Sequence, residues 1–104
     1  MRKNSRRKNL GDCTIEPQDI YDLFDSQDGK CALTGFHMTL SSSDDQELRR
    51  YAATVDRVDN ERGYTLDNVW LVTMLANQIK SNVELEVFVE WCAAVTATVG
   101  DRQR

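Results

Sequence analysis

The first stretch with a regular hydrophobic pattern spans residues 14–26. Ile20, Leu23 and Phe24 recur there at helical spacing, with polar residues between them. Pro17 is well placed near the beginning of this stretch, because the first turn of a helix tolerates a residue without a backbone N–H. The pattern therefore predicts a helix over residues 14–26, which the Asp-Gly pair that follows it would end.

A hairpin, a polar loop and a strand are expected next along the chain. The sequence KCALTGFHM has two short apolar pieces on either side of Thr34-Gly35, which is typical of a tight hairpin. Residues 40–50 are mostly polar and indicate a loop. Residues 51–58 are rich in small and β-branched side chains and predict a strand.

The rest of the chain predicts a second strand and two helices. A polar loop over residues 59–68 is expected to lead into a strand over residues 69–73 and a helix over residues 74–80. The sequence SNVE, residues 81–84, has the form of a capping box and predicts the beginning of a last helix. This last helix carries an apolar stripe at helical spacing, which we expect to belong to the core. The stripe consists of Leu85, Phe88, Val89, Cys92, Val95 and Val99.

Length and composition place these elements in one small domain. The 104 residues are 40% apolar and 29% charged, which is ordinary for a globular chain. Residues 11–104 are expected to form a single α+β domain, and residues 1–10 a basic tail. No apolar run approaches the roughly 20 residues of a membrane span, and none follows the basic N-terminus as a secretory leader requires. We therefore expect a cytoplasmic protein without a membrane partner.

Charge is unevenly distributed along the chain, whose formal net charge is −4. The first nine residues, MRKNSRRKN, carry five cations and no acid, which leaves 8 cations against 17 acids, or −9, in the remainder. Neutralisation of phosphates by cations supplies most non-specific affinity for nucleic acid. An acidic body therefore implies either a local cationic patch helped by the tail or a partner other than DNA. The tail is equally consistent with an arm along phosphates and with a solvated terminus.

The cysteine pattern argues against a structural zinc site. Cys13, Cys31 and Cys92 are widely spaced and, with the single histidine, His37, form no close ligand pair. Structural zinc needs four convergent ligands, commonly as two close pairs. We expect no structural zinc and interpret the cysteines as buried free thiols.

Residues 55–82 contain oxygen-bearing side chains in a pattern that suits a divalent metal. Asp56 lies in a predicted strand, and Asn77 lies in a predicted helix that would pack against it. Mg²⁺ prefers oxygen ligands and keeps several waters, so one carboxylate and one amide oxygen are a reasonable protein contribution. Taken singly, Asp56 is more readily explained by pairing with a nearby arginine, and Asn77 by a polar helix surface.

The order of strand, loop, strand and helix in VDRVDNERGYTLDNVWLVTMLANQIKSN, residues 55–82, resembles the ββα-metal core of HNH nucleases. The pattern is similar to a phage-associated subgroup whose first strand reads DRID where others read DH. The upstream QDGKCALTGFHM also resembles the hairpin that precedes the core in many such proteins. The resemblance, over residues 28–82, implies a ββα-metal core with a preceding hairpin between N- and C-terminal flanking helices. It further implies Mg²⁺, or alternatively Mn²⁺, as the cofactor.

The resemblance also implies roles for individual residues. Asp56 and Asn77 match metal-ligand positions of the family. Asn68 matches an asparagine that hydrogen-bonds across the long loop and determines its shape. Lys80 matches a basic residue that lies near the phosphate backbone.

Arg57 departs from the family pattern, in which a histidine at this position takes the proton from the attacking water. Arginine stays protonated at physiological pH and cannot be that base, but it could bind a phosphate or offset charge in the transition state. Asp59 and His37 are the candidate replacements for the base. The alternatives are an ion pair between Asp59 and Arg57 and a surface position for His37. The candidate catalytic residues are Asp56, Arg57, Asp59 and Asn68.

Three functions remain open at this point. The first, which we favour, is a metal-dependent HNH-type DNA endonuclease or nickase. The second is a non-catalytic nucleic-acid-binding module with the same fold. The third is a phage protein that binds and inhibits a host defence or DNA-processing protein in the host cytoplasm. The cations expected to contact nucleic acid are Arg49, Arg50, Arg62 and Lys80.

Overall fold

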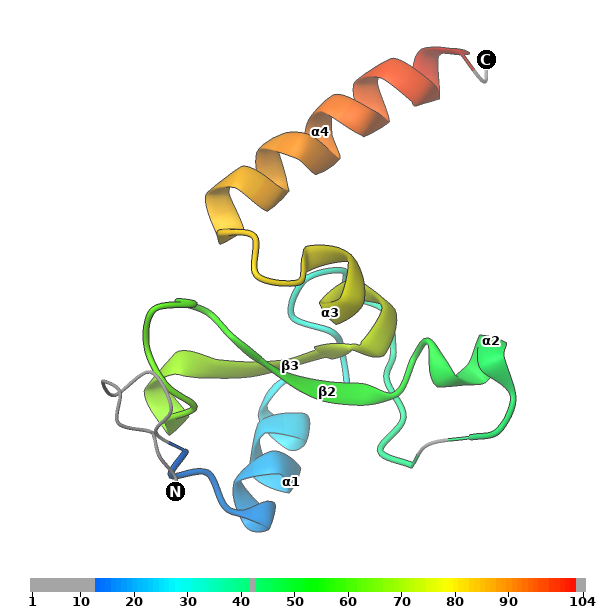
Figure 1. Ribbon diagram of the computed structural model, residues 1–104. Coiled ribbons are helices and arrows are strands. Elements are labelled where there is room, and N and C mark those ends of the chain that lie inside the picture. The colour runs from blue at the N-terminus through cyan, green and yellow to red at the C-terminus, as the bar shows by residue number, and fades with distance from the viewer. Residues whose placement is uncertain (1–12, 42, 103–104) are drawn as a thin grey trace.

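A two-stranded antiparallel sheet with four α-helices makes up the part of the chain that the computed structural model describes, residues 13–41 and 43–102. Figure 1 shows the sheet in the middle, with helices on both sides of it. This arrangement confirms the predicted α+β class. The predicted basic tail over residues 1–10 lies outside the described residues. No helix within the described ranges joins the length and the apolar character that crossing a membrane requires.

The sheet consists of β2 (Ala53–Arg57) and β3 (Val69–Thr73). The two strands pair over their whole length, and Asp56 lies opposite Trp70. β3 has its predicted bounds because its run of apolar and β-branched residues is continuous and buried. β2 is shorter than the predicted strand over residues 51–58.

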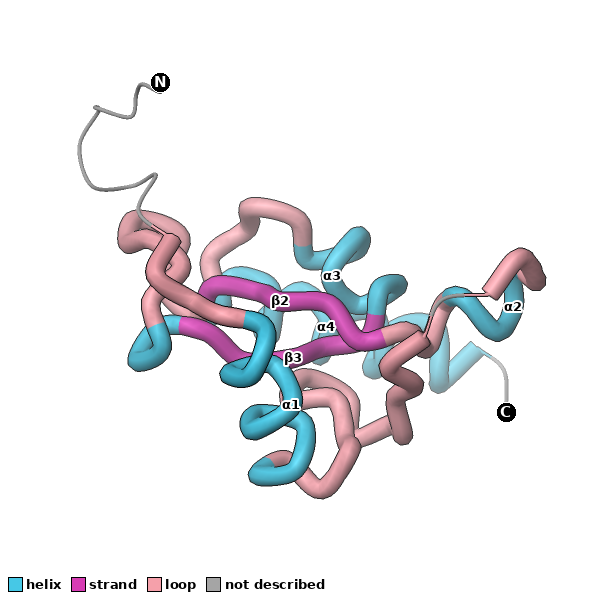
Figure 2. Tube along the Cα trace, turned by 90° about the horizontal axis from the view of Figure 1, so that it is seen from below, coloured by secondary structure: helices cyan, strands magenta, loops and turns pink. Residues whose placement is uncertain are grey.

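Helices cover both faces of the sheet. α1 (Pro17–Ser26) and α3 (Met74–Lys80) lie on opposite sides of it, as Figures 1 and 2 show together. α1 begins later than predicted because the Asp19 carboxylate accepts a hydrogen bond from the Glu16 N–H at 2.9 Å and caps the helix there. α3 has its predicted bounds, with the side chain of Thr73 as its N-terminal cap.

The hydrophobic core is centred on β3. Leu71 and Val72 are both fully buried there, and a fully buried side chain of this kind contributes roughly 1.5–3 kcal/mol. The other buried members of the core are Cys31, Met38 and Ala76, and α1 adds the partly buried Ile20, Leu23 and Phe24. The core therefore joins α1, the hairpin, β3 and α3. It holds α3 against the sheet, next to the residues of the candidate site.

The predicted hairpin forms without extended strands. Met38 N–H donates to the Gly29 carbonyl at 2.8 Å, and Cys31 N–H donates to the Phe36 carbonyl at 2.8 Å. Gly35 makes the turn with φ at 79°, a left-handed conformation that glycine adopts without steric cost. The two sides of the hairpin are therefore joined by a few backbone bonds and one isolated bridge.

The polar segment over residues 40–50 is not only a loop, as was predicted. It contains a one-turn helix, α2 (Gln46–Arg49), because the Asp45 carboxylate accepts hydrogen bonds from the first N–H groups of the helix. The other predicted loop, over residues 59–68, ends in a 3₁₀ turn, Leu66–Asn68.

The last helix, α4 (Leu85–Arg102), differs most from the prediction. Its apolar stripe is not part of the core, since Val89 is 57% and Val95 is 56% exposed. Figure 1 shows α4 extending away from the sheet and the other helices. The predicted capping box is also wrong, because Ser81 ends α3 with a positive φ of 52° and does not begin α4.

The cysteines differ in burial. Cys31 is buried, as predicted, whereas Cys13 and Cys92 are exposed. Burial raises the pKa of the Cys31 thiol, but hydrogen bonds from the Thr34 side chain and from the backbone, including that of Thr73, lower it more. The net result is a Cys31 pKa below its ordinary value. The interpretation of all three cysteines as buried thiols is therefore correct only for Cys31.

Candidate metal and nucleic-acid site

Asp56 lies in a closed layer between β2 and α3, where it is only 5% exposed. Its Oδ1 accepts a hydrogen bond from Lys80 Nζ at 3.3 Å, and its Oδ2 accepts one from Trp70 Nε1 at 2.9 Å. Lys80 is 0% exposed, so both members of this ion pair are removed from water. The expected contact of Lys80 with phosphate disagrees with this burial, because an enclosed ammonium is not presented to a ligand.

Asn77 faces the same layer, one helical turn before Lys80. Its Nδ2 donates to Thr54 Oγ1 at 3.2 Å, and the Thr54 hydroxyl donates to the Val72 carbonyl at 3.2 Å. Thr54 and Asp56 share one face of β2, because side chains two positions apart in a strand point the same way. The structure thus brings Asp56 and Asn77 into one layer, each with a different residue as its direct partner.

The oxygen donors of this layer suit a hard divalent cation. Asp56, Asn77 and Thr54 carry a carboxylate, an amide and a hydroxyl, the oxygen groups that Mg²⁺ accepts. A cation beside Asp56 Oδ1 would compete with the Lys80 ammonium, which already lies 3.3 Å from that oxygen. Among the described residues, no three or more His, Cys, Asp and Glu side chains gather in a way that could hold a metal. The oxygen donors of Asp56, Asn77 and Thr54 fit Mg²⁺ in kind. A cation could reach Asp56 only when the Lys80–Asp56 ion pair opens.

Asn68 bonds across the long loop, as the resemblance implies, and is 1% exposed. Its Oδ1 accepts from the Asp59 N–H at 2.9 Å. Its Nδ2 donates to the carbonyls of Asp59 at 3.0 Å and Gly63 at 2.9 Å. Because backbone groups enclose this side chain, its contribution is to hold the shape of the loop between the strands, and not to contact a substrate.

Arg57 lies on the face of β2 opposite to Asp56, as neighbouring residues in a strand do. Its guanidinium carbon is 5.0 Å from the centre of the Tyr64 ring, within cation–π range. Its Nη1 donates to the carbonyl of Arg62 at 3.2 Å. Neither Arg57 nor Asp59 belongs to an ion pair of the described residues, so the expected pair between them does not form. The side chains of Arg57 and Asp56 therefore lie on opposite faces of β2 and do not form one site.

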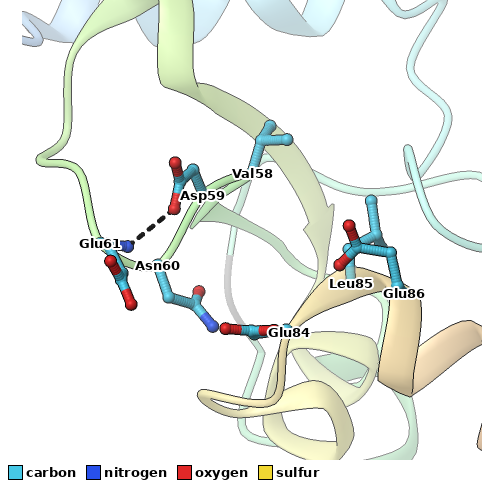
Figure 3. A pocket seen from close by; sticks show the side chains of 7 residues that line it. All are labelled: Val58, Asp59, Asn60, Glu61, Glu84, Leu85 and Glu86. Atoms are coloured by element: carbon cyan, nitrogen blue, oxygen red, sulfur yellow. Dashed lines mark hydrogen bonds between the residues drawn. The ribbon is translucent and has the colours of Figure 1, made fainter.

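Asp59 lines an acidic pocket of about 490 Å³ between the β2–β3 loop and the beginning of α4. Figure 3 shows its four carboxylates, which belong to Asp59, Glu61, Glu84 and Glu86. Asp59 also accepts a hydrogen bond from the Glu61 N–H at 2.9 Å. Four acids repel phosphate, so this pocket is not a nucleic-acid site. His37, the other candidate base, is exposed on the hairpin, in agreement with its alternative interpretation.

The remaining expected phosphate contacts fall at the two ends of β2. Arg49 and Arg50 line a pocket of about 240 Å³ before the strand, and Arg62 lies in the loop after it. The strand between them is about 14 Å long. Arg62 is bonded to Asp67 at 2.7 Å, and hydrogen bonds from Thr65 and Arg62 lower the pKa of Asp67. A phosphate would therefore meet Arg49 and Arg50 directly, and Arg62 only in competition with Asp67.

Trp70 and Thr54 are site residues that the sequence reasoning missed. Trp70 is the cross-strand neighbour of Asp56, so an antiparallel alignment of the two predicted strands is the signal that could have identified it. Thr54 could have been found as the residue that shares a strand face with Asp56. Comparisons with protein-family models, with curated proteins and with solved structures gave no match to this chain.

Proposed function

We propose that this protein is a metal-dependent DNA endonuclease or nickase of the HNH type. The observation that carries the proposal is that the Asp56 carboxylate on β2 and the Asn77 amide on α3 enter the same layer between strand and helix. These two residues match the metal-ligand positions of the family that the sequence resembles. The loop bonded by Asn68 gives further support, because the family holds this loop in the same way.

Each residue would contribute through its position. Asp56 and Asn77 would each supply one oxygen to Mg²⁺ or Mn²⁺, and the metal would stabilise the negative charge that develops at the scissile phosphate. The Lys80–Asp56 ion pair competes with cation binding, so we expect a modest affinity for the metal. Arg57 would bind a phosphate and would not accept a proton. The candidate bases from the sequence lie elsewhere, because Asp59 lines the acidic pocket and His37 is exposed on the hairpin.

Nicking of supercoiled plasmid in Mg²⁺ or Mn²⁺ tests this proposal. We expect the parent to produce nicked circles and Asn77→Ala to do so at least about ten-fold more slowly, because a ligand position is lost. Asn82→Ala is the matched control, since Asn82 is exposed just after the same helix and is not part of the pocket that Arg49 and Arg50 line. A change at Asp56 is less informative, because it would also leave Lys80 buried without its partner.

Metal binding is measured separately, by thermal unfolding. Mn²⁺ should raise the midpoint of the parent and of Asn82→Ala, and should raise that of Asn77→Ala much less. A parent that neither nicks plasmid nor gains stability with either metal would contradict the proposal.

Arg57→His tests whether the arginine stands where the family has its base. A histidine with a pKa near ~6.5 can take a proton from water, and general base catalysis contributes about 10²–10⁴-fold. If position 57 is the family's base position, Arg57→His should increase the nicking rate by about 10²-fold or more, whereas a histidine that stays on the face of β2 opposite to Asp56 should leave the rate unchanged. Arg57→Ala is the control and should lower DNA binding or nicking, because it removes the cation without adding a base. An equal rate in parent, Arg57→His and Arg57→Ala would exclude a role for this position.

A second function, binding of a host protein without catalysis, is favoured by the acidic pocket. Four carboxylates line it, and the chain outside its first nine residues has a net charge of −9. Such a surface is complementary to a basic protein. If the parent neither nicks plasmid nor binds duplex DNA in a salt-sensitive way, this second function would replace the first.

A further inference from the structure

The apolar side of α4 has no partner in the described fold. Val87, Trp91, Val95 and Val99 recur at every fourth position, with Phe88 beside them, and we call these five residues the α4 face. Trp91 is 68% exposed and Val95 is 56% exposed. Monomeric proteins rarely expose contiguous apolar patches of more than a few hundred Å². We therefore expect another polypeptide segment or molecule to pack against the α4 face.

The α4 face continues into a groove that it shares with the end of α3. The groove has a volume of about 660 Å³, and Ile79 and Val83 line it together with Trp91 and other residues of α4. These two side chains are themselves 62% and 40% exposed. A groove with apolar walls on both sides suits the apolar side chains of another helix.

α4 also needs tertiary contacts to persist as a helix. Valine and threonine make up six of its 18 residues, and both are weaker helix formers than alanine or leucine. Helix propagation in water is only weakly favourable even for good helix formers, and most helical stability in proteins comes from the packing of an apolar face. A partner on the α4 face would supply that packing.

Charge decides what can cover the α4 face. Glu84, Glu86 and Glu90 lie at its N-terminal end, so the phosphates of nucleic acids and anionic lipids are disfavoured there. Residues 1–12 carry five cations and only Met1 and Leu10 as large apolar side chains, which cannot fill an apolar groove. A second α4, in contrast, offers an apolar stripe of equal length.

We propose that two copies of this chain form a dimer by antiparallel packing of their α4 faces about a two-fold axis. An axis between Trp91 and Val95 places Trp91 opposite Val95 of the second copy. The same axis places Val87 opposite Val99 of the second copy. The α4 face is therefore self-complementary, as an interface with two-fold symmetry requires.

Charges at the two ends of α4 favour the same register. With the axis between Trp91 and Val95, Glu84 of one copy lies opposite Arg102 of the other, at both ends of the interface. Parallel packing would instead place Glu84 opposite Glu84, and would align the two helix dipoles unfavourably. Antiparallel packing is thus the arrangement in which both the apolar stripe and the terminal charges are satisfied.

The available area is sufficient for a dimer of moderate affinity. At 68% exposure, Trp91 alone offers roughly 150 Å². With Ile79, Val83 and the valines of the α4 face, the exposed apolar surface is on the order of 500 Å² per copy. Stable interfaces bury about 800 Å² per partner including a polar rim, and a helix of 18 residues is about 27 Å long, which provides that rim. We therefore expect dissociation in the micromolar range.

Sedimentation equilibrium of the full chain, without DNA or metal, tests the proposal. The parent should be a dimer at about 100 μM and a monomer below about 1 μM. Val95→Glu should weaken the dimer at least about ten-fold, because it places a charge in the interface. Val89→Glu is the matched control, since Val89 is 57% exposed against 56% for Val95 but lies outside the groove. Urea unfolding of each variant checks that the core around β3 is retained, and the helical circular dichroism signal is expected to fall on dissociation because α4 loses its packing.

A charge exchange tests the orientation of the two helices. Glu84→Arg and Arg102→Glu should each weaken the dimer several-fold, and the double variant should restore it, because the opposed charges are then exchanged. A double variant as weak as the single ones would exclude the antiparallel register. A parent that stays monomeric at about 100 μM, or a Val89→Glu variant as weak as Val95→Glu, would overturn the dimer itself. None of these outcomes depends on whether the chain is a nuclease.

Discussion

Replacing Lys80 with methionine is expected to lower the free energy of unfolding by about 3–5 kcal/mol. Lys80 is fully buried, and its ammonium lies 3.3 Å from Asp56 Oδ1. Methionine keeps most of the apolar stem but not the charge. The Asp56 carboxylate would then remain in the interior with the Trp70 indole N–H as its partner. Urea unfolding followed by circular dichroism measures the change.

Arg62→Met is the matched control for this prediction. The Arg62–Asp67 pair is shorter, at 2.7 Å, but its side chains are 49% and 71% exposed. Water screens exposed pairs, so the loss in this variant should be much smaller than in Lys80→Met. If Lys80→Met costs no more than Arg62→Met, the ion pair of Lys80 is not buried in solution.

The double variant Asp56→Asn with Lys80→Met separates the effect of charge from that of packing. The new asparagine keeps an oxygen for the Trp70 N–H, and no buried charge is left without a partner. Replacement of both members of a buried ion pair is often neutral. The double variant should therefore recover at least about 2 kcal/mol relative to Lys80→Met alone.

The Lys80 variant also bears on the proposed metal site. In the parent, the Lys80 ammonium is bonded to the carboxylate oxygen for which a divalent cation would have to compete. Without the ammonium, Mn²⁺ should stabilise the protein more than it stabilises the parent. The same gain should be absent when Asp56 is also replaced, because the carboxylate that binds the cation is then missing.

The elements next to the site could be predicted because their signals are local. The continuous apolar run of β3 is read within a few residues, and the bounds predicted for β3 and for α3 directly after it are confirmed. Asn68 was assigned to the loop by resemblance, and its side chain is bonded there to the backbone of Asp59 and Gly63. The candidate bases and the phosphate contacts of the exposed arginines remain predictions.

The wrong predictions concern which group a side chain contacts in the folded protein. The sequence around that side chain carries no signal for such contacts. Lysine is almost never fully buried without a partner, and the partner of Lys80 lies 24 positions away on another element. The periodicity of α4 predicts an apolar stripe, but that stripe includes Leu85 and Val89 and misses Val87 and Trp91, which line the groove. It cannot show whether that stripe meets this chain's own core, solvent or a second molecule, and Val89 and Val95 are in fact exposed.

Replacing Asn68 with alanine is expected to cost about 3 kcal/mol of unfolding free energy. The side chain is buried, and its loss leaves the N–H and carbonyl of Asp59 and the carbonyl of Gly63 without their partners. A buried polar group without a partner costs about 1–3 kcal/mol, and part of that cost is recovered here where water reaches the loop. Urea unfolding measures the loss, and amide hydrogen exchange at Asp59 should become faster because the loop opens.

Two further variants show whether the amide geometry of Asn68 is responsible. Asn68→Asp keeps an acceptor for the Asp59 N–H but removes both donors and turns a carboxylate toward two carbonyl oxygens, so it should cost at least as much as alanine. Asn60→Ala is the control within the same loop. Asn60 donates to the Asn82 carbonyl at 2.7 Å in a partly exposed position, where water can replace it at a cost below about 1 kcal/mol. A loss in Asn68→Ala no larger than in Asn60→Ala would show that the loop keeps its shape without this side chain.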